Sequence, residues 1–304
     1  MRILFLGTPD FAVPSLRALI AAGHEIVGVC CQPDKPQGRH FTLTPPPAKR
    51  EAEARGIPVL QPATLRDEAA QRAIAALAPE LIVVAAYGKL LPRAVLELPA
   101  RGCINVHGSL LPKYRGAAPI QWAVIRGEAV TGVTIMQMDE GLDTGAMLLQ
   151  KSLAIGEHET AGELFGRVAA LGAEALTEAL GRLDAIAPVP QDESGATWAP
   201  MLQKADGAID WSQDAAAIDA RIRGVTPWPG AYTTCRGKRL KIHRARLADR
   251  CGETGKPIGG DGLIVACGRG AIELLEVQPE GGRRMSAADF ARGQRLTAED
   301  RFGI

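Results

Sequence analysis

The feature that most constrains the fold is the apolar run at residues 81–86, which reads L-I-V-V-A-A. Every side chain in it is apolar, so both faces of an extended strand would need cover, as in the centre of a parallel sheet. Apolar runs at 2–6 and 25–31 are joined by a stretch with helical periodicity, which is typical of a βαβ unit. We therefore predict an α/β domain with a Rossmann-like, mostly parallel sheet.

The last third of the chain has a different pattern. Short strands are expected at regular spacing over 231–235, 239–244, 262–267 and 271–278, separated by glycine-rich turns, and Arg236-Gly237 suits a hairpin. This predicts a smaller, barrel-like β domain. The composition from Ala187 onward is that of a linker. We predict a first domain over residues 1–186, a linker over 187–205 and a second domain over 206–304.

Polar side chains interrupt the apolar strand that begins at Cys103. Residues 103–119 read C-I-N-V-H-G-S-L-L-P-K-Y-R-G-A-A-P. Residues two apart in a strand point to one face, so Asn105 and His107 should project together from the carboxyl end, where ligands of open α/β sheets bind. The alternative is structural, with His107 as a capping residue and Asn105 in a turn.

A second apolar strand runs into an acidic loop. Residues 133–145 read V-T-I-M-Q-M-D-E-G-L-D-T-G, which places Asp143 between two glycines. A carboxylate in a glycine-rich loop can approach a neighbouring strand end closely. Asn105, His107 and Asp143 then form a candidate set for general acid–base catalysis and for stabilising an oxyanion.

Several classes of function are disfavoured. A dinucleotide site needs three glycines in the first turn, which here reads G-T-P-D-F. The 35 Lys and Arg against 34 Asp and Glu predict no partner by net charge. The six cysteines form no C-x-x-C motif and have no His cluster nearby, so we expect reduced thiols and no metal. The apolar runs are too short to span a membrane, and we predict a cytoplasmic protein.

The ordered set of motifs resembles the 10-formyltetrahydrofolate-dependent formyltransferases. The resemblance is carried by Asn105-Val106-His107, Ser109-Leu110-Leu111-Pro112 and Gly141-Leu142-Asp143-Thr144-Gly145. Further matching segments are Gly7-Thr8-Pro9-Asp10-Phe11, Gln32-Pro33-Asp34, Arg115-Gly116-Ala117-Ala118-Pro119-Ile120-Gln121 and Trp228-Pro229. Over this length the chain is most similar to the branch of the family that acts on methionyl-tRNA.

The resemblance implies an activity and a site. It implies transfer of a formyl group from 10-formyltetrahydrofolate, a cosubstrate, to the α-amino group of initiator methionyl-tRNA, without a metal. It also implies a second domain that resembles an OB fold. The family's three catalytic positions fall on Asn105, His107 and Asp143. The folate pocket is assigned to Ser109, Leu110, Leu111 and Pro112, with Tyr87 as a further folate-binding candidate.

Two basic segments are candidates for tRNA binding. Residues 32–47 form a long polar loop with Lys35 and Arg39, and the family uses an insertion here to bind the acceptor end of initiator tRNA. Phe41 and Thr42 stand where many members carry lysines. The alternative is a solvated loop without a function.

The second basic segment, residues 236–250, holds seven basic side chains and one acid. On an extended strand Arg239, Lys241 and His243 share one face, and Leu240 and Ile242 share the other. Arg239 and Lys241, with Arg244, form a candidate surface for tRNA phosphates. The alternative is an edge strand that lysines protect from aggregation.

Three other functions remain open: a formyltransferase for a sugar-nucleotide amine, a 10-formyltetrahydrofolate hydrolase, and a non-catalytic RNA-binding relative. The basic segments favour an RNA substrate over the first two, and the intact Asn–His–Asp set disfavours the third. Arg115 has two possible partners, a phosphate or a local carboxylate. We expect the protein to act as a monomer.

Overall fold

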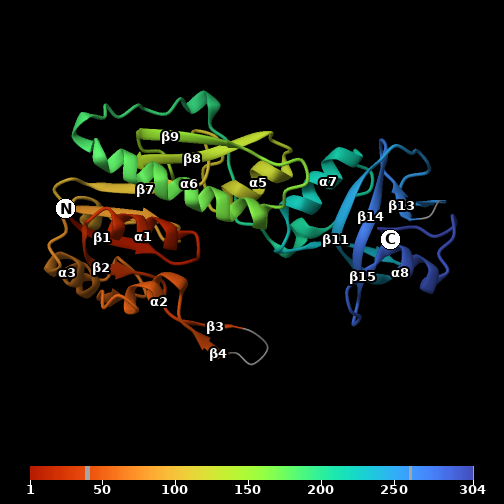
Figure 1. Cartoon of the computed structure of the whole chain (residues 1–304), viewed down its shortest axis with the longest axis horizontal. Coiled ribbons are helices and arrows are strands. Elements are labelled where there is room, and N and C mark those ends of the chain that lie inside the picture. The colour runs from red at the N-terminus through yellow and green to blue at the C-terminus, as the bar shows by residue number, and fades with distance from the viewer. Residues whose placement is uncertain (38–41, 260–261, 304) are drawn as a thin grey trace. The chain divides into compact units, whose positions relative to one another are not determined.

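The computed structural model describes residues 1–37, 42–259 and 262–303, and the chain divides into two compact units. Unit 1 comprises Met1–Pro119, Thr131–Leu153 and Phe165–Ala199. Unit 2 comprises Ile120–Val130, Ala154–Leu164 and Pro200–Ile304. Figure 1 shows the course of the chain through its helices and strands.

Unit 1 is built on a mixed sheet of seven strands in the order β5-β2-β1-β6-β7-β8-β9. The strands are β1 (Arg2–Gly7), β2 (Glu25–Cys30), β5 (Val59–Leu60), β6 (Leu81–Ala85), β7 (Cys103–His107), β8 (Val130–Gln137) and β9 (Met147–Ala154). Neighbouring strands from β5 to β7 are parallel, and β7 pairs antiparallel with β8. The predicted Rossmann-like, mostly parallel sheet is confirmed.

Helices cover the sheet of unit 1 on both faces. The helices of unit 1 are α1 (Ala12–Ala21), α2 (Pro47–Glu53), α3 (Glu68–Ala76), α4 (Arg93–Leu96) and most of α6 (Ala161–Gly181), with short 3-10 turns at Leu183–Ala185 and Glu193–Gly195. The helix α5 (Pro119–Ile125) falls almost wholly in unit 2. Leu4 and Ile82 of the sheet pack in one core with Ile74 of α3 and Val95 of α4.

The opposite face of the sheet carries α6 and α1. Gly172 of α6 lies so close to Val106 that an added Cβ would come within 2.9 Å of the valine methyl group. Phe11, before α1, packs edge-on against Phe165 of α6 with ring centroids 5.4 Å apart. Because β1, β6 and β7 are parallel and covered on both sides, their carboxyl ends meet at one edge that loops can reach.

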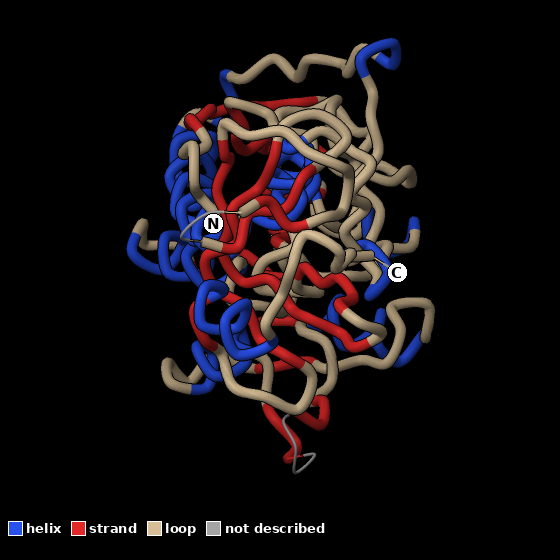
Figure 2. Tube along the Cα trace, turned by 90° about the vertical axis from the view of Figure 1, so that its right-hand side faces the viewer, coloured by secondary structure: helices blue, strands red, loops and turns tan. Residues whose placement is uncertain are grey.

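The predicted loop at 32–47 contains a two-stranded antiparallel ribbon, β3 (Lys35–Gln37) and β4 (Thr42–Thr44). Figures 1 and 2 show it extending away from the sheet of unit 1. No ribbon side chain whose burial the structure describes is buried, and Leu43 is 64% exposed, so the sequence of these strands lacks the apolar alternation by which strands are recognised. At its base, hydrogen bonds from Gln61 and Lys49 hold the pKa of Asp34 below its usual value.

Unit 2 is built on an antiparallel sheet in the order β10-β11-β14-β13-β12, with β15 paired to β14. Its strands are β10 (Ala231–Cys235), β11 (Lys238–Ala248), β12 (Pro257–Ile258), β13 (Leu263–Ala266), β14 (Ala271–Pro279) and β15 (Met285–Ser286). The helices are α7 (Ala215–Gly224) and α8 (Ala287–Gln294), after a 3-10 turn at Lys204–Gly207. The sheet is a half-barrel, which agrees with the predicted β domain.

The hairpin between β10 and β11 forms as predicted. Arg236 and Gly237 have φ angles of 50° and 72°, and Cys235 pairs with Lys238. Two successive residues with positive φ give the turn whose twist matches that of the paired strands. Within the described residues, no helix combines the length and the apolar content that crossing a membrane requires. The six cysteines are free thiols, and all but Cys251 are buried.

Leu240→Ala in β11 should lower the free energy of unfolding by about 2–5 kcal/mol, because this 1% exposed side chain would leave a cavity. Leu247→Ala in the same strand is the matched control, since that side chain is 55% exposed and its loss should cost no more than about 0.5 kcal/mol. Urea titration followed by circular dichroism measures both. Equal losses would contradict the assigned faces of β11.

Candidate active site

The structure brings Asn105, His107 and Asp143 together. The first two lie at the carboxyl end of β7 and the third in the loop after β8. Asp143 Oδ1 is 3.5 Å from Asn105 Nδ2, and Asp143 Oδ2 is 3.7 Å from His107 Nδ1. Asn105 is 9% exposed and His107 5% exposed. The three side chains therefore form one polar cluster at the edge of the sheet, in which Asn105 and His107 are buried and Asp143 is half-buried.

The hydrogen bond of His107 fixes its tautomer. Nε2 lies 2.9 Å from the backbone oxygen of Tyr114, and a carbonyl oxygen can only accept. Nε2 therefore carries a proton and donates it to this bond. In the neutral ring the lone pair is on Nδ1, the atom that faces Asp143, so His107 can take up a proton there.

The loop that carries Asp143 has little freedom. Asp143 has a φ of 55°, and the backbone N–H of Gly116 donates to its Oδ2 over 2.9 Å. At Gly145 an added Cβ would lie 1.9 Å from the backbone oxygen of Gln137, so only glycine fits. The predicted close approach of a carboxylate to the end of β7 depends on this packing.

Arg115 pairs with a carboxylate of this chain, which is one of the two partners that the sequence left open, the other being a phosphate. Its side chain is 2% exposed, and Nη1 and Nη2 donate to the two oxygens of Glu193 over 2.9 and 2.7 Å. The hydrogen bonds to Glu193 are the largest cause of a raised pKa at Arg115. Nε and Nη2 also donate to Gln191 Oε1. Both partners come from the segment predicted as a linker, where nothing in the composition marks them as neighbours of the site.

The segment from Ser109 to Pro112 is fixed by side chains that sequence reasoning did not identify. Thr134 Oγ1 of β8 donates to the backbone oxygen of Ser109 over 2.7 Å and accepts from the N–H of Leu111 over 3.0 Å. Gln150 of β9 donates to the oxygen of Leu111 over 2.8 Å. Ser109 and Leu111 are buried, whereas Leu110 and Pro112 are partly exposed. Only the latter two side chains present surface to a ligand.

Tyr87 lies in the core and is 1% exposed. Its hydroxyl is 3.4 Å from Cys30 Sγ, and burial raises its pKa. Its backbone oxygen accepts from Thr8 Oγ1 over 3.3 Å and from Gln32 Nε2 over 3.1 Å. The ring is therefore not available to a ligand, so a folate contact at this position would involve the backbone.

The candidate tRNA-binding residues that the structure describes are exposed. Lys35 lies on β3, whereas Arg39 lies outside the described residues. Arg239 and Lys241 alternate with buried residues of β11, as predicted, and Arg239 stacks over Tyr232 at 3.6 Å. Strict alternation would turn Arg244 toward the core, but the pairing of β11 with β14 shifts register on both sides of this residue, which keeps it exposed.

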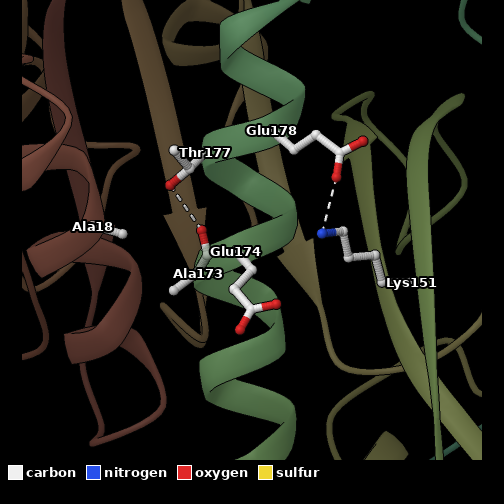
Figure 3. Close-up of a pocket in the computed structure, with 6 residues that line it drawn as sticks. All are labelled: Ala18, Lys151, Ala173, Glu174, Thr177 and Glu178. Atoms are coloured by element: carbon white, nitrogen blue, oxygen red, sulfur yellow. Dashed lines mark hydrogen bonds and ion pairs between the residues drawn. The ribbon is translucent and has the colours of Figure 1, made fainter.

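A separate hollow of about 500 Å³ lies beside α6 (Figure 3). It is lined by Ala18, Lys151, Ala173, Glu174, Thr177 and Glu178. Lys151 Nζ is paired with Glu178 over 2.9 Å, and none of the predicted site residues lines it. Among the described residues, no three His, Cys, Asp or Glu side chains are grouped so that they could hold a metal ion.

Comparison with known proteins shows the family to which the chain belongs. A family model described as formyl transferase matches residues 1–180, and one for the formyl transferase C-terminal domain matches residues 201–295. The chain is 50% identical to a methionyl-tRNA formyltransferase of Geobacter metallireducens, over 100% of this chain and 99% of that protein. It is 54% identical to one of Anaeromyxobacter dehalogenans over 97% of each. The chain belongs to the methionyl-tRNA formyltransferase family.

The family predicted from the motifs is thus confirmed, and solved structures agree on the fold. WlaRD, a sugar 3N-formyl transferase solved in the presence of dTDP and 5-N-formyl-THF, matches with a TM-score of 0.68 at 17% identity. The match covers 90% of this chain and 97% of that one. At this identity the likeness is one of fold.

Thr134→Val keeps the shape of the side chain but removes the hydroxyl that Ser109 and Leu111 share. We expect a loss of about 1–3 kcal/mol in the free energy of unfolding for each buried backbone group left without a partner. Urea titration measures the loss. A value within about 0.5 kcal/mol of the unchanged protein would show that the hydroxyl is dispensable.

Proposed function

We propose that this protein is an enzyme that transfers the formyl group of 10-formyltetrahydrofolate to the α-amino group of initiator methionyl-tRNA. The product is the N-formylmethionyl-tRNA used in translation initiation. The observation that carries this function is the identity of about half the residues, over the whole chain, with methionyl-tRNA formyltransferases. The likeness to a sugar formyltransferase extends to the fold alone, so it does not favour a sugar-nucleotide acceptor.

We further propose a division of labour along the chain. Residues 1–186 hold the formyl donor and the catalytic groups, 187–205 connect the domains, and 206–304 bind tRNA together with the ribbon in 32–47. The enzyme acts as a monomer in the cytoplasm. The catalytic role of residues 1–186 is supported by the Asn–His–Asp cluster in unit 1, and the tRNA-binding role of residues 206–304 by the exposed cations of β11 in unit 2.

The chemistry sets what the site must supply. An α-amino group has an unperturbed pKa of about 7.7–8.0, so a useful fraction is neutral and nucleophilic near neutral pH. Its nitrogen attacks the formyl carbon, a C–N bond forms, and the carbonyl oxygen gains negative charge. The bond from carbon to N10 then breaks. The attacking nitrogen loses one proton and N10 gains one, so a donor to the oxygen and a proton carrier are required.

The cluster of Asn105, His107 and Asp143 supplies both the hydrogen-bond donor and the proton carrier. The Asn105 amide is a donor for the oxyanion, because its contact with Asp143 is long and readily exchanged for a shorter one. His107 takes the amine proton on Nδ1, since Nε2 is committed to the oxygen of Tyr114, and passes it to N10. Asp143 Oδ2, 3.7 Å from Nδ1, stabilises the imidazolium between these steps.

Asn105→Ala should lower kcat by about 10²–10³-fold, the usual cost of losing one oxyanion donor. His107→Ala should lower it by about 10²–10⁴-fold, the range for general acid–base catalysis. Initial rates of formyl transfer to charged initiator methionyl-tRNA measure both, with uncharged tRNA and elongator methionyl-tRNA as controls. Wild-type rates in either variant would remove that residue from the catalytic set.

Arg239→Ala and Lys241→Ala should raise the KM for tRNA and leave the KM for folate unchanged, because both cations are exposed on β11. Removing a cation that binds one phosphate should also reduce the slope of log affinity against log salt by about 1. Lys256→Ala is the control, since that lysine in unit 2 is already paired with Glu253 over 2.7 Å. An unchanged salt slope in the β11 variants would argue against this surface.

A further inference from the structure

The backbone that follows the side chain of Asp143 is held by one amide, that of Gln191. Gln191 Nε2 donates to the carbonyl oxygens of Asp143 and Gly145, each over 2.8 Å. Asp143 adopts the left-handed conformation, with a φ of 55°, which is uncommon for a residue other than glycine. The two bonds from Gln191 hold the carbonyl of this residue and that of Gly145, and so restrain the backbone that follows Asp143.

The orientation of this amide is fixed from its other end. Gln191 Oε1 accepts from Arg115 Nε over 3.0 Å and from Arg115 Nη2 over 2.8 Å. An amide has two N–H groups and two lone pairs, so all four are used here. Rotating it by half a turn would set the N–H groups against the guanidinium and the oxygen against two carbonyls, which repel it.

Arg115 is itself fixed on both sides. Its backbone N–H donates to the oxygen of Thr197 over 2.8 Å, and its oxygen accepts from the N–H of Ala199 over 2.7 Å. Its guanidinium is buried and also paired with Glu193. The neighbouring Gly116 N–H donates to Asp143 Oδ2. The backbone beside Arg115 thus contacts the carboxylate of Asp143, and its side chain acts on the Asp143 backbone through Gln191.

We propose that Gln191 is a positioning residue of the catalytic site, one that holds the Asp143 carboxylate beside His107 by locking the backbone of the 143–145 turn. It touches neither the reacting atoms nor the substrates and acts through Asp143. The proposal deepens the proposed function and rests on it for the catalytic part of its test. A displacement of about 1 Å at a catalytic group can cost about 10²-fold in rate.

Gln191→Glu separates this role from simple packing. The carboxylate has the same size as the amide and keeps the bonds from Arg115, with added charge attraction. It has no N–H, and its second oxygen would face the carbonyls of Asp143 and Gly145. If Gln191 only filled space, this variant would be neutral. If it positions Asp143, the variant should be about as damaging as Gln191→Ala.

The test measures kcat, KM and hydrogen exchange in the full-length protein. For Gln191→Glu and Gln191→Ala we expect kcat to fall by about 10²-fold with each KM changed by less than about threefold, the pattern of lost transition-state interactions. The backbone amides of residues 139–146 should exchange hydrogen faster in both variants than in the wild-type protein, as measured by mass spectrometry. Gln213→Glu, at an exposed turn in unit 2, is the matched control and should change neither readout.

The outcomes are distinguishable. Wild-type kcat in Gln191→Glu, or unaltered exchange at 139–146 in both Gln191 variants, overturns the positioning role. A wild-type enzyme that transfers no formyl group overturns the proposed function instead, and the exchange measurement then still decides whether Gln191 locks the turn. Circular dichroism of Gln191→Glu, which keeps the Arg115 contacts, checks that the fold is intact.

Discussion

The rest of the site depends on the burial of polar groups at the end of β7. All five residues of this strand are buried, including Asn105 and His107, and a buried polar group is costly unless it is hydrogen-bonded. The partners of Asn105 and His107 are groups outside the strands. They come from the loops after β7 and β8, which supply the Tyr114 oxygen and the Asp143 carboxylate. The strand β7 is thus both a central part of the core and the element that carries two residues of the polar cluster.

The loops in turn depend on one another. The loop after β7 places Gly116 against Asp143, the loop after β8 carries Asp143, and the segment at 191–199 joins both through Arg115 and Gln191. Strands and helices set the sheet edge, but three separate stretches of chain set the positions of the catalytic atoms. An α-amino group is partly neutral near neutral pH and needs little activation as a nucleophile. Positioning of the reacting groups is therefore the larger part of the rate enhancement that such a site provides.

The sequence alone predicted the features that local physics governs. Asn105 and His107 share a face because strands alternate, and β6 is central because it is apolar on both faces. Arg236-Gly237 forms a turn because Gly237 adopts positive φ without steric cost. Features set by distant partners were missed. Gln191 is 48 residues from Asp143, and the exposure of Arg244 depends on the register shift between β11 and β14. Local composition and periodicity identify neither Gln191 as the partner of Asp143 nor the register in which β14 pairs with β11.

A competition between acceptors tests which amine this enzyme formylates. The protein would be given 10-formyltetrahydrofolate with equal amounts of initiator methionyl-tRNA, elongator methionyl-tRNA and a sugar-nucleotide amine, and each acceptor would be analysed by mass spectrometry. Formyl groups found on the methionine of the initiator tRNA, with the other acceptors unchanged, are the predicted result. Formylation of the sugar-nucleotide amine, or consumption of the donor with every acceptor unmodified, would contradict it.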